Sequence, residues 1–126
     1  MPPEALLEID GDHWGIFART SLKRVKSFLS GFDNFEFHPG VFPTTGLELS
    51  PEEKFCLVHV DVDLYRSTYD ACEFFYPRMV TGGIMVFNDY RVAKCEGATA
   101  AIDEFFEDKP EEIIFGGAER TFLRKL

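Results

Sequence analysis

Two short apolar runs with a helical pattern between them predict a strand, helix, strand unit in the middle of the chain. The runs are FCLVHV at 55–60 and IMVF at 84–87, and such continuous apolar character is typical of strands with helices packed on both faces of a sheet. Ser67 and Asp70 fit the start of the helix, and the TGG at 81–83 fits its end. The apolar positions between them recur at helical spacing: Ala71, Phe74, Phe75 and Met79. Two strands joined in this way are nearly always parallel, so the pattern indicates an α/β domain.

Weaker patterns predict two elements ahead of this unit. Thr20 or Ser21 can cap a short amphipathic helix that Gly31 stops. Its apolar stripe consists of Leu22, Val25, Phe28 and Leu29. Residues 34–40, NFEFHPG, alternate apolar and polar positions before Pro-Gly, which predicts a half-buried strand with a turn. Residues 1–14 show no clear period and are expected to be a loosely ordered lead.

The carboxyl-terminal part reads as a helix followed by a hairpin. Residues 97–108 place apolar side chains on one helical face, and Pro110 closes the helix. Residues 111–126 form two short apolar runs about Gly116 and Gly117, which predicts a closing antiparallel hairpin.

Composition places these elements in one domain, residues 1–126, and limits its function. The chain is 45% hydrophobic and contains 14 phenylalanines, which is enough apolar material for a core. Its formal net charge of −9 argues against binding to nucleic acid or to an anionic membrane, since both require a basic surface. Divalent cations are better partners for such a chain.

Cysteine usage and the amino-terminal sequence suggest a cytoplasmic protein. Cys56, Cys72 and Cys95 are too few and too scattered for a disulfide framework, and we expect buried, inert thiols at Cys56 and Cys72. The acidic start MPPEALLEIDGD does not have the pattern of a signal peptide. No apolar run approaches the roughly 20 residues of a membrane span.

Acidic and amide side chains follow both central strands. Asp61 and Asp63 come after the first strand, and Asn88 and Asp89 come after the second. Ligands bind beyond the carboxyl ends of strands in a parallel sheet, and oxygen donors without clustered cysteine or histidine suit Mg²⁺. The alternative is that each acid simply caps the turn or helix after it, as acids at strand ends often do. His59, inside the strand, is expected to be a core histidine.

Several stretches together resemble the macrocin O-methyltransferase family: GIFARTSLKRVKSFLSGF, FHPGVFP, HVDVDLYRSTYDACEFFYPRMVTGGIMVFNDY and GATAAIDEFF. This resemblance implies a metal-dependent enzyme that transfers a methyl group from S-adenosylmethionine to the hydroxyl of a sugar or related small molecule. It assigns the metal to Asp61, Asn88 and Asp89, and it makes Asp61 the candidate general base. Asn88 stands where the family has an acid, and this uncharged amide should weaken metal binding.

The resemblance covers the back half of a class I methyltransferase fold. It implies a partial Rossmann-like α/β fold with a mostly parallel sheet and a carboxyl-terminal antiparallel hairpin. The glycine-rich turn that holds the methyl donor is not found in the first 14 residues, so no donor-binding residue is assigned. Absence of the donor-binding strands should bare a hydrophobic edge of the sheet, which we expect to pair with another copy or with a partner chain.

Two other functions compete with methyl transfer. The chain is alternatively a non-catalytic remnant or interaction module that keeps the back half of the fold. A D-x-D enzyme acting on a nucleotide sugar through Mg²⁺ would need phosphate-binding residues beside the acids, and only Arg66 and Arg91 are available. A phosphatase is disfavoured because Leu64 and Tyr65 follow the D-x-D motif in place of a sharp turn bearing Gly-Thr.

Overall fold

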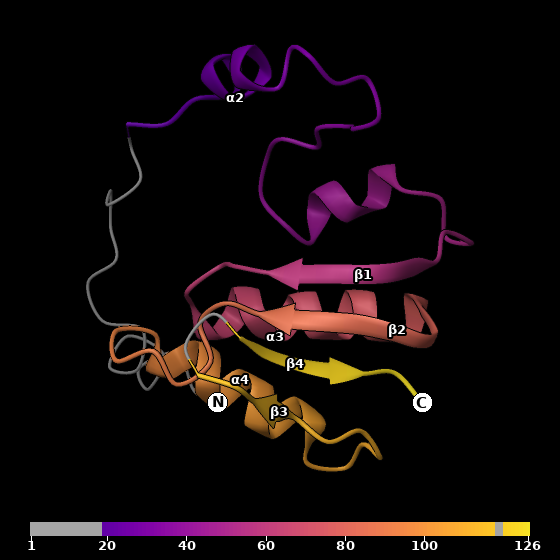
Figure 1. The fold of residues 1–126 in the computed structure, drawn as a ribbon, viewed down its shortest axis with the longest axis vertical. Helices are drawn as coiled ribbons and strands as arrows, with labels where there is room; N and C mark the ends of the chain where they lie inside the picture. Colours follow the sequence, from indigo (N-terminus) through magenta and orange to yellow (C-terminus); the bar gives the residue numbers. More distant parts are fainter. Residues whose placement is uncertain (1–18, 118–119) are drawn as a thin grey trace.

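A computed structural model describes residues 19–117 and 120–126, so the lead expected at 1–14 lies outside the described residues. Four strands form one mixed sheet in the order β1-β2-β4-β3. They are β1 (Phe55–Val60), β2 (Met79–Phe87), β3 (Ile114–Phe115) and β4 (Thr121–Arg124). β1 and β2 are parallel, whereas β4 is antiparallel to both of its neighbours. The α/β class, the parallel central pair and the closing hairpin are therefore confirmed, and the sheet as a whole is mixed (Figure 1).

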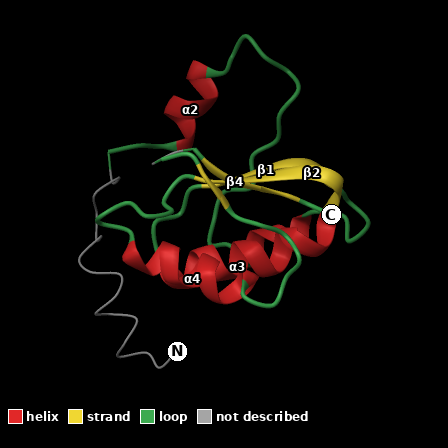
Figure 2. Ribbon diagram, turned by 60° about the horizontal axis from the view of Figure 1, so that its bottom comes forward, coloured by secondary structure: helices red, strands yellow, loops and turns green. Residues whose placement is uncertain are grey.

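Two helices pack together against one face of this sheet. α3 (Tyr65–Phe75) connects β1 to β2 through the short 3₁₀ helix η2 (Tyr76–Arg78), and α4 (Glu96–Phe106) follows β2. Figure 2 shows α3 and α4 side by side on the same side of the sheet. The core lies between these layers, and its most deeply buried members are Cys72, Met85, Phe87, Ile102 and Leu123.

The boundaries of the central helix differ from the prediction. α3 begins at Tyr65, after Leu64 at its N-cap, so Ser67 and Asp70 lie inside the helix and do not cap it. Asp70 instead forms an ion pair with Arg66 one turn earlier, at 2.8 Å. Asp70 is therefore an i, i+4 ion-pair partner within the helix and not a capping residue.

The TGG at 81–83 is also not a helix end, because it belongs to β2. Phe55 pairs with Met79 whereas Leu57 pairs with Ile84, so the residues between Met79 and Ile84 bulge out of the ladder with β1. Gly82 adopts a φ of +81°, and a Cβ at Gly83 would lie 2.9 Å from a backbone oxygen. Glycine is required here by the bulge and by the close backbone approach, and sequence alone does not separate this use from a turn.

The amino-terminal elements are the least integrated part of the fold. Ser21 caps α2 (Leu22–Phe28) as predicted, and its side chain accepts a hydrogen bond from the Arg24 N–H at 3.3 Å. α2 buries no residue, however, and Phe28 is 85% exposed. The strand predicted at 34–40 is wrong, since these residues form bends and coil. A 3₁₀ helix, η1 (Thr44–Glu48), then leads to β1.

Burial of β1 on both faces is also wrong. Val58 and Val60 face the core, but Leu57 is 61% exposed and His59 is exposed, so His59 is not a core histidine. The strand register places apolar side chains from all four strands on the same face of the sheet as Leu57. We call this set the open face: Leu57, Ile84, Val86, Phe122 and Ile114. Among the described residues, α3 and α4 cover one side of the sheet, whereas α2 lies on the other side and buries no residue (Figure 2).

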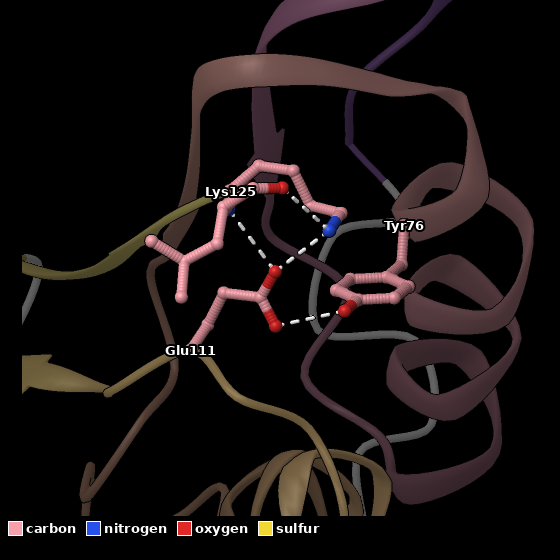
Figure 3. Close-up of polar contacts among 4 residues, drawn as sticks. Tyr76, Glu111 and Lys125 are labelled. Atoms are coloured by element: carbon pink, nitrogen blue, oxygen red, sulfur yellow. Dashed lines mark hydrogen bonds and ion pairs between the residues drawn. The ribbon is translucent and has the colours of Figure 1, made fainter.

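A buried ion pair ties the end of the chain to the helical layer (Figure 3). Glu111, just ahead of the hairpin, has a fully buried side chain, and its carboxylate accepts hydrogen bonds from Tyr76 and Lys125, each at 2.7 Å. The backbone N–H of Leu126 donates to the same carboxylate at 3.2 Å. This cluster joins η2, the segment before β3 and the residues after β4.

Candidate active site at the carboxyl ends of β1 and β2

The strand register brings the two polar strand ends together. Val60 is paired with Phe87, and the N–H of Asn88 donates to the Val60 carbonyl at 3.0 Å. Asp61 and Asn88 are the next residues along the two strands, so both lie at the same edge of the sheet. This placement agrees with the rule that ligands bind beyond the carboxyl ends of parallel strands.

Asp89 holds the loop that follows β1. Its side chain is buried, and Oδ2 accepts hydrogen bonds from the backbone N–H groups of Val62 and Asp63, at 3.1 and 3.0 Å. The Asn88 side chain donates to Oδ1 of Asp89 at 3.3 Å. Asp89 therefore caps a turn, as the alternative to a metal site predicts for an acid at a strand end, and its carboxylate lies at the carboxyl ends of β1 and β2.

Asp63 occupies the centre of a tight turn. Its φ is +60°, and the Leu64 N–H donates to the Val62 carbonyl at 2.6 Å, which closes a three-residue turn about Asp63. Aspartate tolerates this left-handed region better than most residues, yet positive φ in a non-glycine residue stores strain that its surroundings must hold. The bond from the Asp63 N–H to Asp89 supplies that restraint.

Cys95 completes the cluster from the far side. Its thiol donates to Oδ1 of Asp63 at 3.7 Å, and potential ligand atoms of Asp63, Asp89 and Cys95 all lie within 4.8 Å of one another. Burial, followed by the charges of Asp89, Asp63 and Asp61, raises the Cys95 pKa to about 11. The thiol is thus protonated near neutral pH and acts as a hydrogen-bond donor to Asp63.

The sequence placed Asp63 among the strand-end acids, but the family resemblance did not assign it to the metal, and Cys95 was given no role. Asp63 carried a usable signal as the second acid of the D-x-D motif. Cys95 did not, because it lies 32 residues further along the chain and reaches Asp63 only through the fold.

The donor set fits a hard cation. Asp63 and Asp89 offer carboxylate oxygens within 4.8 Å of one another, and carboxylate oxygens are groups that Mg²⁺ prefers. The predicted ligands Asp61 and Asn88 lie at the same strand ends, but Asp61 is exposed and is not a member of that close group. The protonated Cys95 sulfur is a poor ligand for such an ion, and its hydrogen bond to Asp63 favours a positioning role.

Two tyrosines attach this edge to α4. The Tyr90 hydroxyl donates to Asp103 at 2.7 Å, and the Tyr65 hydroxyl donates to Glu104 at 2.6 Å. Burial and the bond to Glu104 raise the Tyr65 pKa to about 12, so its hydroxyl remains a donor throughout the physiological range. Tyr65 and Tyr90 follow the two polar strand-end segments in the sequence, so these hydrogen bonds connect both segments to α4.

A cavity of about 320 Å³ lies beside β1, between the loop containing His38 and the second half of α3. His59 and Val62 line it from the strand side, together with Phe42 and Phe75. The His38 ring bonds to Glu48 at 2.7 Å, and this hydrogen bond raises the His38 pKa. The cavity is bordered by Val60 and Val62, the residues on either side of Asp61, and none of the site acids lines it.

Comparison with known proteins identifies the family. The family described as Macrocin-O-methyltransferase (TylF) matches residues 16–112. A tetracenomycin-pathway relative from Streptomyces olivaceus, 8-demethyl-8-(2,3-dimethoxy-alpha-L-rhamnosyl)-tetracenomycin-C 4'-O-methyltransferase, is 33% identical over 91 residues, which are 69% of this chain and 34% of that protein. Mycinamicin III 3''-O-methyltransferase from Micromonospora griseorubida is 29% identical over 101 residues, 77% of this chain and 39% of the relative.

A solved structure has the same fold. The O-methyltransferase NovP superimposes with a TM-score of 0.70 and 27% identity over 84% of this chain and 45% of its own. The chain therefore spans less than half the length of the relatives it matches. The family resemblance read from the sequence motifs is confirmed: this chain belongs to the macrocin O-methyltransferase family, and it corresponds to part of that fold.

Proposed function

We propose that this chain forms the metal- and acceptor-binding part of an O-methyltransferase that uses S-adenosylmethionine to methylate a hydroxyl of a sugar or another small molecule. The observation that carries the proposal is the meeting of Asp61, Asn88 and Asp89 at one edge of the sheet, within a chain of this family. The names of the relatives add support, since they describe methylation of sugar-bearing natural products.

In the proposed reaction the acceptor hydroxyl lies against Asp61. Asp61 is exposed at the strand end and is free of a backbone-holding role in the hydrogen bonds described, so its carboxylate can take the hydroxyl proton. S-adenosylmethionine, when bound, would supply the methyl group and release its sulfur as a thioether; none of the described residues is assigned to hold it. Asp89 fixes the turn after Asp61 through two backbone N–H groups, and so it positions the base.

Asp61, Asn88 and Asp89 would hold Mg²⁺ in this arrangement. When bound, the ion lowers the pKa of a coordinated hydroxyl. Asp89 Oδ2 accepts hydrogen bonds from two backbone N–H groups, so Oδ1, which accepts one hydrogen bond from the Asn88 amide, is the oxygen that would bind the ion. The neutral Asn88 predicts weaker binding than a site with three acids.

Calorimetric titration with Mg²⁺ or Mn²⁺ tests the metal site without requiring activity. We expect Asp61→Asn to weaken binding and Asn88→Asp to tighten it, each by about tenfold, because each changes the site by one unit charge. Asp33→Asn is the matched control, since Asp33 is exposed and lies in the coil after α2. Equal affinities for the wild type and both site variants would refute the metal assignment.

The exposed edge of the sheet favours a second candidate, a non-catalytic interaction module. Within the described ranges 19–117 and 120–126 no strand precedes β1, and β1 has a strand partner on one side only. Calorimetry with S-adenosylmethionine separates the two functions. Heat of binding, either with this chain alone or with a complementing chain, supports the methyltransferase, whereas its absence in both cases supports the module.

A further inference from the structure

The cavity beside β1 lies between that strand, the segment 38–49 and α3. Residues from both faces of the strand line it, namely Val60, which faces the core, and His59, which is exposed. Residues of the segment 38–49 line it from across the strand, and Ala71 and Phe75 of α3 line it from the helical layer (Figure 1). The segment 38–49 therefore lies along the edge of β1 that faces away from β2, with the cavity between them.

Aromatic packing and one hydrogen bond hold the walls of this cavity in place. Phe42 stacks on Phe75, with ring centroids 5.6 Å apart and ring planes within 7° of parallel, so the segment 38–49 is attached to α3. The His38 ring bonds to Glu48 at 2.7 Å and so connects the two ends of the segment. Walls that are ordered before a ligand arrives reduce the entropy lost on binding.

The size and the lining of the cavity suit a flat aromatic ligand. A cavity of about 150 Å³ is enough to hold benzene, and sites for small molecules begin at about 300 Å³. At about 320 Å³ this cavity has room for roughly two fused rings. Most of its lining is apolar: Phe42, Leu49, Val60, Val62, Ala71 and Phe75. The two phenylalanine rings favour an aromatic partner, since aromatic pairs gain energy beyond the area they bury.

The polar groups of the lining offer a hydrogen bond without a free charge. They belong to His38, Thr45 and His59, and no acid, lysine or arginine is among the lining residues, although the chain contains 22 acids. His38 bonds to Glu48 and lies 3.5 Å from Glu36, so any positive charge on its ring is shared with two carboxylates. His59 has no hydrogen bond or ion pair with another described residue, and its ring can bond to a ligand. A neutral hydroxyl fits this lining better than a carboxylate, which would lose water without gaining a cation.

We propose that this cavity binds a phenol-like ligand of roughly two fused rings, whose hydroxyl forms a hydrogen bond with His59. The rings lie against Phe42 and Phe75, between the segment 38–49 and α3. The cavity is separate from the strand-end acids, since none of them lines it. The inference rests on the cavity alone and requires neither a metal nor methyl transfer.

Calorimetric titration of the purified chain with 2-naphthol, without metal or S-adenosylmethionine, tests the site. We expect saturable one-to-one binding, and 2-naphthoate should bind about tenfold more weakly because its charge has no cation to meet. Nuclear magnetic resonance of the wild-type chain locates the ligand without any substitution. The amide signals of Thr45, Gly46 and Val62 should shift on addition of 2-naphthol, because these residues line the cavity.

Two variants test the walls of the cavity. Leu49→Trp should fill part of the space and weaken 2-naphthol binding by about tenfold or more. Leu47→Trp is the matched control, because Leu47 is 81% exposed on η1 and is not among the lining residues. His59→Phe should weaken 2-naphthol by about three- to tenfold, the loss of one hydrogen bond, and should leave binding of 2-methylnaphthalene unchanged. His59 is exposed, so this variant should keep the wild-type circular dichroism.

Four results would overturn the proposal. The first is the absence of saturable 2-naphthol binding to the folded wild-type chain, and the second is tighter binding of 2-naphthoate. The third is a set of shifted amides confined to the open face, which would place the ligand on the exposed sheet. The fourth is an equal loss of affinity in Leu49→Trp and Leu47→Trp. Since none of these readouts involves metal or S-adenosylmethionine, loss of the methyltransferase hypothesis would not change them.

Discussion

Replacing Glu111 by alanine should remove a large part of the stability of this domain. The Glu111 side chain is fully buried, and its carboxylate accepts two hydrogen bonds at 2.7 Å, from Tyr76 and Lys125, and one at 3.2 Å from the Leu126 N–H (Figure 3). Hydrogen bonds to a charged group contribute about 1.5–3 kcal/mol each, and breaking a buried ion pair costs about 3–5 kcal/mol. Lys125 is 19% exposed and regains some water, so we expect a loss at the low end, about 3 kcal/mol.

Urea unfolding followed by circular dichroism measures this loss of unfolding free energy, and two further variants show how much of it comes from the buried charge. Glu111→Gln keeps the shape and an acceptor for Lys125 but loses the charge, so about 1–2 kcal/mol is expected. Glu112→Ala is the matched control: its side chain is exposed, and its effect should stay within about 0.5 kcal/mol. A loss below about 1 kcal/mol for Glu111→Ala would refute the reasoning, because the buried Glu111–Lys125 pair would then stabilise the domain no more than an exposed ion pair does.

The Glu111 carboxylate should also make the stability of the domain depend on pH. Burial alone raises the Glu111 pKa, but the hydrogen bonds from Lys125, Tyr76 and the Leu126 N–H outweigh it, and the pKa lies below its ordinary value. Because the Glu111 pKa is lower in the folded state, its carboxylate contributes fully to the free energy of unfolding above the pKa of the unfolded state, about 4.3. That contribution is lost as the pH falls through the pKa of the folded state. The difference in stability between wild type and Glu111→Gln should therefore be constant from pH 7 to about 5 and should shrink below about 4.

Three further predictions concern the site and the core. Asp89→Asn should cost about 1–3 kcal/mol and speed hydrogen exchange at the two amides that the carboxylate holds; unchanged exchange would contradict its positioning role. The expectation of a buried thiol is wrong for Cys56, which is exposed, and right for Cys72, whose pKa burial raises to about 12; Cys56 should react quickly with a thiol reagent at pH 8 and Cys72 only on unfolding, and equal rates would be inconsistent with the fold. Gly46→Ala should cost about 1–3 kcal/mol in urea unfolding, because the new Cβ would lie 2.8 Å from the Phe74 ring; an unchanged midpoint would show that the ring moves freely.

Local patterns predicted the central unit well because they reflect local physics. The apolar run at 55–60 coincides with β1, and Ser21 caps α2 through a bond within one helical turn. The acids after the two strands were found in the same way, since a polar residue that ends an apolar run is visible in sequence. Prediction of their meeting needed only the rule that a strand, helix, strand connection is parallel.

The failures concern contacts between distant segments. Residues 34–40 alternate like a strand, but a strand requires a partner, and none of the described strands pairs with them. His59 lies in an apolar run, yet it is exposed because helices cover only the other face of β1. Cytoplasmic location stays a prediction; among the described helices, none is long and apolar enough to cross a membrane.

By itself the sequence determined that a strand, helix, strand unit lies at the centre of this chain, which family the chain belongs to, and that oxygen-bearing side chains follow two strands. Tertiary structure alone decided that Asp89 holds the turn around Asp63, that Cys95 reaches that turn, and that Leu57 and Ile114 are exposed on the face of the sheet opposite α3 and α4. The physical reason is that hydrophobic periodicity and capping are set within a few residues, whereas hydrogen bonds between separate loops and the covering of a sheet depend on how distant segments pack.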